Sequence, residues 1–190
     1  MRTHAALLRG INVSGRNKVS MPELRLVVES LGHSDAVTYI QSGNVAFTAA
    51  KPRASSTALA NELEAAIADR LEANPAVVVL ARRELADVVR NNPFPDVDDH
   101  RLLHAVFLSE APGPDVVASV AGAVERARGK DSRDDARVIG RTLYLWTPDG
   151  FANSILQPEL SRGGQHRTPM EKGTARNWRT VNALASLLGD

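Results

Sequence analysis

The sequence predicts an α+β protein made of two ferredoxin-like units, each a βαββαβ plait (an α/β plait) with a mainly antiparallel sheet. Two observations predict this fold. The order strand, helix, strand, strand, helix occurs twice along the chain, once in each half. Each half also contains two short β-rich runs on either side of a tight turn, which indicates a hairpin. We expect the first unit to cover residues 1–92 and the second to cover residues 93–190.

The first half begins with a strand and a capped helix. Ala5–Leu8 is a short apolar run, followed by a polar loop over residues 10–18. Ser20 and Glu23 have the spacing of a capping box, which satisfies exposed amides at the start of a helix. Apolar residues then recur at i, i+3, i+4 and i+7, which predicts one buried helix face, and Gly32 is expected to end the helix.

A hairpin, a helix, a strand and a further helix complete the first half. We expect them at residues 37–48, 59–71, 77–80 and 83–90. In the turn of the hairpin, Gly43 and Asn44 can supply positive φ angles. The stretch over residues 91–99 is rich in Pro, Asn and Asp, which is typical of a linker.

The second half repeats this pattern up to its last element. A strand, a helix and a hairpin are expected at residues 102–108, 114–128 and 136–146, and two helices at about 152–160 and 175–188. In the last helix Trp178 shares one face with Val181, and Thr174 is a candidate N-cap. The second unit therefore ends in helix, and its final strand is hard to find.

Composition and charge exclude several classes of protein. Because the chain has no Cys, it has no disulfide, thiolate metal site or cysteine nucleophile. His100 and His104 have the spacing of a zinc pair, but His104 lies in a strand-like run, so we expect no metal and no cofactor. The net charge of +1 gives no global basic field for nucleic acid. With no signal peptide and no apolar run near the ~20 residues of a membrane span, we expect a cytoplasmic protein without a membrane partner. The sequence indicates no oligomeric state.

Polar side chains gather at one edge of the first predicted sheet. In a right-handed βαβ crossover the first two strands run parallel, so their carboxyl ends lie at the same edge. The residues expected there are rich in donors and include no carboxylate: Arg9, Asn12, Arg16, Asn17, Lys18, Gln41, Ser42 and Asn44. Such a group suits a phosphate or carboxylate. The alternative is that these are turn residues and solvated cations.

A second basic cluster lies at residues 161–180, which contain five basic residues and one acidic residue. Its candidate ligand contacts are Arg176, Asn177 and Trp178. They would form the opposite wall of the site if the second half folds back over the first. The alternative is that Trp178 anchors the core below a capped helix.

Three separated motifs resemble a bacterial family of uncharacterised proteins catalogued as domain of unknown function 1697. They lie at Leu7–Val13 with Asn17–Val19, at Tyr39–Phe47 and at Thr174–Val181. The resemblance covers essentially the whole chain and implies a pair of ferredoxin-like plaits, in agreement with the repeated pattern. It implies no activity, ligand or catalytic residue. Residues 157–171 depart from the family's pattern, because Gly163, Gly164 and Pro169 interrupt the helix usual there.

Three functions remain open. We expect a binding module for a small anionic or phosphorylated ligand. The first alternative is an enzyme acting on a phosphorylated or acidic metabolite, although the motifs supply no histidine or carboxylate as a general base. The second alternative is a nucleic-acid-binding protein that uses both basic clusters, which the near-neutral net charge disfavours. Tyr144 and Trp146 alternate onto one strand face as in RNA-binding sheets, or they pack within the protein.

Overall fold

The computed structural model describes residues 1–190 except residues 13–16, 52, 163–168 and 190. The chain forms two compact units, one of Met1–Val89 with Asn182–Asp190 and one of Arg90–Val181. These units differ from the expected ranges chiefly in the C-terminal segment, which groups with the first unit. No helix in the described part of the chain has both the length and the apolarity of a membrane span.

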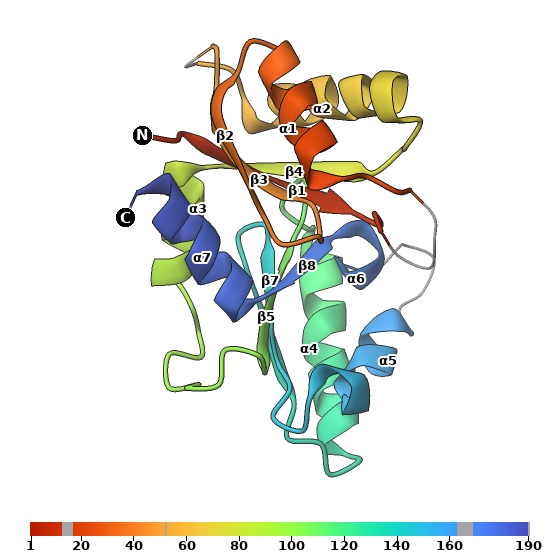
Figure 1. Ribbon diagram of the computed structural model, residues 1–190. Helices are drawn as coiled ribbons and strands as arrows, with labels where there is room; N and C mark the ends of the chain where they lie inside the picture. The colour runs from red at the N-terminus through yellow and green to blue at the C-terminus, as the bar shows by residue number, and fades with distance from the viewer. Residues whose placement is uncertain (13–16, 52, 163–168, 190) are drawn as a thin grey trace. The chain divides into compact units, whose positions relative to one another are not determined.

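The first unit is a βαββαβ plait followed by one more helix (Figure 1). Its elements are β1 (His4–Arg9), α1 (Met21–Ser30), β2 (Ser34–Tyr39), β3 (Asn44–Thr48), α2 (Ser56–Leu71), β4 (Ala76–Ala81) and α3 (Arg82–Arg90). The sheet has the order β2-β3-β1-β4, and every neighbouring pair is antiparallel. This is the strand order of a ferredoxin-like plait.

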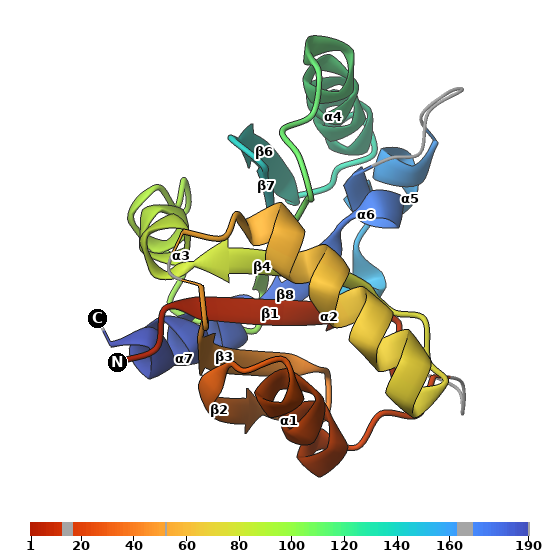
Figure 2. The same cartoon turned by 90° about the horizontal axis from the view of Figure 1, so that it is seen from above.

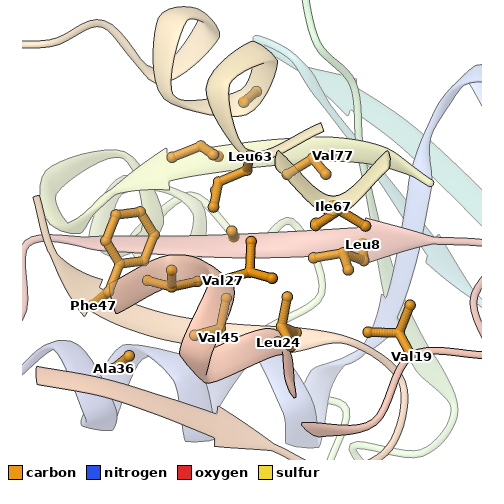
Figure 3. Close-up of a cluster of buried hydrophobic side chains, with 14 of the residues drawn as sticks. Leu8, Val19, Leu24, Val27, Ala36, Val45, Phe47, Leu63, Ile67 and Val77 are labelled. Atoms are coloured by element: carbon orange, nitrogen blue, oxygen red, sulfur yellow. The ribbon is translucent and has the colours of Figure 1, made fainter. Parts of the chain in front are cut away.

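Helices α1 and α2 cover one face of this sheet (Figure 2). Figure 3 shows strand residues facing helix residues across this core, among them Leu8, Val45, Phe47, Leu24, Val27, Leu63 and Ile67. Ser20 is the N-cap of α1, because its hydroxyl oxygen accepts from the Glu23 amide at 3.3 Å, while the Glu23 carboxylate accepts from the Ser20 hydroxyl at 2.5 Å. Burial of these aliphatic side chains, each contributing roughly 1.5–3 kcal/mol, holds the helices to the sheet.

The turn between β2 and β3 is confirmed, but only one of the two residues expected to have a positive φ angle has one. Gly43 has a φ of +73°, whereas the second positive value, +49°, belongs to Ile40 and not to Asn44. A Cβ on Gly43 would lie 2.8 Å from Leu8 Cβ, so only glycine fits there. Asn44 instead begins β3 as a buried strand residue.

The second unit repeats the plait with a more broken second half. Its elements are β5 (Leu103–Phe107), α4 (Pro114–Arg128), β6 (Asp135–Ile139), β7 (Thr142–Trp146), the 3-10 helix η1 (Phe151–Asn153), α5 (Leu156–Ser161), α6 (Pro169–Lys172) and β8 (Thr174–Asn177). Helix α7 (Trp178–Leu188) begins in this unit and continues into the C-terminal segment that groups with the first. The sheet order is β6-β7-β5-β8, again antiparallel throughout. The helix expected over residues 152–160 is interrupted, with η1 and α5 in its place.

The missing fourth strand of the second unit is β8, which the sequence placed near the start of the last helix. Its residues pair with β5 from His104 opposite Asn177 to Phe107 opposite Thr174. The expectation that Thr174 caps the helix is therefore wrong. The cap is Asn177, whose Oδ1 accepts from the Thr180 amide at 3.0 Å and from the Thr180 hydroxyl at 2.9 Å.

The strand registers relate the two units residue by residue. Leu7 lies opposite Asn44 at the hairpin end of the first sheet, where Phe107 lies opposite Thr142 in the second. At the other end His4 lies opposite Ala81, just before α3. His104 lies opposite Asn177, just before α7. His4 and His104 therefore occupy equivalent positions.

Candidate functional site

The structure brings together the loop and the turn that the sequence placed at one sheet edge. The Asn12 side-chain nitrogen donates to the carbonyl oxygens of Val19 and Gln41, each at 2.9 Å. Its side-chain oxygen accepts from the Val19 amide at 3.0 Å. Asn12 therefore ties the loop after β1 to the turn before β3.

The other asparagines of this edge also serve the backbone. The Asn17 amide donates to the Gly10 carbonyl at 3.1 Å. Asn44 is fully buried and donates to the Tyr39 carbonyl at 3.0 Å and to the Ser42 hydroxyl at 2.9 Å. Asn12 has a φ of +55° and Asn17 one of +47°, a region that asparagine tolerates well. Because both amide hydrogens of Asn12 and of Asn44 are engaged, neither amide group is available as a donor to a ligand.

The described cations of this edge, unlike its asparagines, do not hold the backbone. Arg9 is half-buried at the end of β1, and Lys18 is exposed. Neither side chain forms a hydrogen bond or ion pair within the described part of the chain. Gln41 is exposed, and Arg16 lies outside the described residues.

The three candidate residues of the second basic cluster belong to the second unit. Arg176 lies on β8 and donates to the Ala175 carbonyl at 2.8 Å, and burial lowers the pKa of its guanidinium to about 10. Asn177 caps α7. Trp178 is buried, with its ring centroid 6.0 Å from that of Tyr144. Its packing is that of a core anchor.

The first unit also contains an open pocket that the sequence reasoning missed. Its volume is about 530 Å³, and it lies where β1 begins, β4 ends, and α2 and α3 start. Its polar lining has three arginines, Arg53, Arg82 and Arg83, and one carboxylate, Glu84. The neutral polar residues are Thr3, His4, Ser56 and the N-cap of α2, Ser55. We call it the arginine pocket.

The single carboxylate of the arginine pocket holds the starts of two helices together. Glu84 Oε2 accepts from the Ala81 amide at 2.7 Å, as the third residue of a helix does in a capping box. It also accepts from the Ser56 hydroxyl at 2.8 Å, at the start of α2. The Arg82 amide donates to the Thr3 carbonyl at 2.8 Å, which ties α3 to the start of β1.

The three arginines outnumber the one carboxylate of the pocket. All three are exposed, and none forms an ion pair with another described residue; Arg82 contacts the Met1 sulfur. With three guanidinium groups, one carboxylate and a neutral His4, the lining sums to +3 − 1 = +2. Arg82 and Arg83 are the first two residues of α3, where the helix dipole disfavours cations. An anion bound there would relieve both effects.

His4 lies at the inner wall of the arginine pocket. It is 6% exposed, its ring is stacked on Phe47, and its Nδ1 lies 2.8 Å from the Thr3 hydroxyl. Burial lowers the pKa of the His4 imidazole, while the Glu84 carboxylate partly raises it and His33 lowers it further. The imidazole is therefore neutral near pH 7 and can donate or accept one proton.

The equivalent position of the second unit holds His104, which is half-buried. The ring of His104 packs against Phe151 of η1, with the ring centroids 4.5 Å apart. Its Nδ1 is buried and has no hydrogen-bond partner, and burial lowers the pKa of His104 to about 4. The two equivalent histidines therefore have different neighbours: His104 is half-buried beside Phe151, and the buried His4 lines the arginine pocket.

One signal in the sequence could have indicated the arginine pocket. Cations near the start of a helix are unfavourable, and here they occur twice, as Arg53 two residues before the N-cap of α2 and as Arg82-Arg83 at the start of α3. For metals, the described residues include no group of three or more His, Asp or Glu that could hold an ion.

Comparisons with known proteins address the fold and the family. A family model described as a protein of unknown function, DUF1697, matches residues 1–144. The structure of the conserved bacterial protein SP0830 from Streptococcus pneumoniae is similar, with a TM-score of 0.73, 24% identity and 98% of each chain covered. At this identity the likeness shows a shared fold. The comparison with curated proteins gives no match.

Proposed function

The chain belongs to the DUF1697 family, whose function is unknown, and from its site we propose that it is a binding module for a small anionic or phosphorylated ligand. The observation that carries this proposal is the arginine pocket, in which three arginines without ion-pair partners among the described residues surround a cavity of about 530 Å³. Guanidinium groups match the geometry of phosphate and carboxylate oxygens. The volume lies within the ~300–1,000 Å³ of small-molecule sites.

This proposal keeps the ligand class expected from the sequence and moves the site. Arg9 and Lys18 remain surface cations at the predicted edge, but the amides that were to orient the anion there hold the backbone instead. The arginine pocket lies at the other end of β1, beside His4.

An enzyme acting on a phosphorylated metabolite is the second candidate. The observation that favours it is His4, because a buried neutral imidazole in an anion-binding pocket is a candidate general base or acid that the sequence motifs lack. For the nucleic-acid alternative, Tyr144 is 1% exposed, so its ring face is closed to a base.

The test is a thermal-shift titration of the full chain with inorganic phosphate, against sodium chloride at equal ionic strength. Binding to the native state stabilises it by about 1.4 kcal/mol at a ligand concentration ten times Kd, which raises Tm by roughly 3–6 °C for a chain of this size. Phosphate should raise the Tm of the wild type and of Arg70→Ala, whose arginine lies at the far end of α2. It should have little effect on the double variant Arg53→Ala/Arg83→Ala. A shift that the double variant retains, or no shift beyond that of sodium chloride, would refute the proposal.

A further inference from the structure

We infer that the arginine pocket binds a phosphate monoester of a hydroxyl-rich body, such as a sugar phosphate, and not a nucleotide base or a dicarboxylate. This inference rests on the proposed function and names the ligand class of the same pocket. Three observations support it: the charge of the lining, the size of the cavity and the chemistry of the lining residues other than the arginines.

The charge of the lining matches a dianion. The net charge of +2 is balanced by a group that carries close to two negative charges. A phosphate monoester carries about −1.5 to −2 at pH 7, whereas a diester or a single carboxylate carries about −1. Because Arg82 and Arg83 are adjacent at the start of α3 and Arg53 precedes α2, the cations approach one group from two segments.

The cavity is larger than a phosphate group alone. A water molecule takes about 30 Å³ of liquid volume, and a phosphate is only a few times larger. A cavity of about 530 Å³ therefore has room for an organic body of metabolite size attached to the phosphate.

The remaining walls favour hydroxyl groups over a flat ring. Among the lining residues that the structure describes, the one ring is that of His4, and it is stacked on Phe47. No second ring is therefore present among them to hold a base between two faces. The Ser55 hydroxyl accepts from the Ala58 amide at 3.1 Å, which leaves its hydrogen for an acceptor on the ligand. The neutral His4 imidazole can also bond a ligand hydroxyl.

The experiment is isothermal titration calorimetry of the full chain with a matched series: inorganic phosphate, ribose 5-phosphate, AMP, ribose and succinate. We expect ribose 5-phosphate to bind about tenfold or more tightly than inorganic phosphate, because the hydroxyls add hydrogen bonds to the polar wall. AMP should gain no affinity over ribose 5-phosphate, ribose alone should not bind, and succinate should bind more weakly than inorganic phosphate.

The outcomes separate the ligand class from the proposed function. Tighter binding of AMP than of ribose 5-phosphate would assign a nucleotide, and tighter binding of succinate than of phosphate would assign a dicarboxylate. Equal affinities for phosphate and ribose 5-phosphate would show that the body makes no contact. Each of these results overturns the inference and leaves anion binding standing. If no anion in the series binds, the proposed function itself fails.

Ser55→Asp tests the position of the phosphate without removing the helix cap. Aspartate is as good an N-cap as serine, so the variant should keep the stability of α2. Its carboxylate lowers the charge of the pocket and should weaken ribose 5-phosphate binding at least about tenfold. Arg70→Ala should bind like the wild type. Unchanged affinity in a folded Ser55→Asp variant would place the phosphate elsewhere and overturn the inference.

Discussion

The two units share a strand register and differ in what lies beside the first strand's histidine. In the first unit the connection after β3 carries Arg53 and leads into the long helix α2, and His4 lines an open pocket. In the second unit the corresponding connection folds into η1, and Phe151 packs against His104. The strand order is common to both units, so the difference around the histidine lies in the connection after the third strand.

The units also use their cations differently. In the second unit three cations surround the buried carboxylate of Glu159: Arg126 at 3.0 Å, Lys130 at 2.5 Å and Arg162 at 3.0 Å. Together they lower the pKa of Glu159, chiefly through the hydrogen bonds from Lys130 and Arg126. The three arginines of the pocket in the first unit have no such partner among the described residues. One cluster pairs with a buried carboxylate, and the other is the one for which we propose a ligand.

The largest expected effect separates a structural amide of the first unit from a cation that has no ion pair among the described residues. Asn44→Ala removes a buried amide that donates to the Tyr39 carbonyl and the Ser42 hydroxyl. Leaving the carbonyl without its donor and opening a small cavity should cost about 2–4 kcal/mol in the free energy of unfolding, measured by urea denaturation. Arg9→Ala, whose side chain makes no ion pair in the described residues, should change it by at most about 0.5 kcal/mol. If Asn44→Ala were as mild, the amide would be free for a ligand after all.

The next effect concerns His104, the histidine of the second unit. The pKa of His104 is lowered to about 4 in the folded protein, against about 6.5 when unfolded. Between these values the unfolded chain binds more protons than the folded one, so stability is present above pH 6.5 and is lost as the pH falls toward 4. The loss from this one group should reach about 3 kcal/mol.

The variant His104→Leu isolates this contribution. It replaces an imidazole with an unpaired buried Nδ1 by an apolar side chain, so unfolding free energy should depend less on pH between 6.5 and 4. The wild type and the variant should be compared by urea denaturation across this range. Identical pH dependence in the two proteins would show that His104 is protonated without penalty and would contradict the prediction.

Much of the fold is predictable because its signals are local. Helix α4 has the expected bounds, since Pro114 and Gly129 mark its two ends. Strand β8 is not predictable in the same way, because four residues are too few to show alternation and the helical spacing of Trp178 and Val181 extends the last helix backwards. Its strand conformation comes from pairing with β5, a contact that is distant in sequence.

The candidate site, too, was predictable only in part. The contact between the loop after β1 and the hairpin turn follows from topology, and the Asn12 bonds to Val19 and Gln41 are consistent with it. The role of the asparagines as backbone ties depends on side-chain geometry, which the residue types leave open. The arginine pocket collects residues from the start of β1, the connection before α2 and the start of α3, and no single segment contains its pattern.

The smallest expected effect is the sharpest test of the difference between the two cation clusters. Without anion, Arg83→Ala should raise the free energy of unfolding by about 0.3–1 kcal/mol, because it removes a cation from the N-terminal end of α3 and from the neighbourhood of two other arginines. Arg70→Ala, at the C-terminal end of α2 where a cation is favourable, should lower it by a similar amount. Saturating phosphate should reverse the order of Arg83→Ala and wild type, since the ligand stabilises only a protein that binds it. Urea denaturation at equal ionic strength, with and without phosphate, measures both effects. A loss of stability in ligand-free Arg83→Ala would mean that this arginine serves the fold, as the cations around Glu159 do.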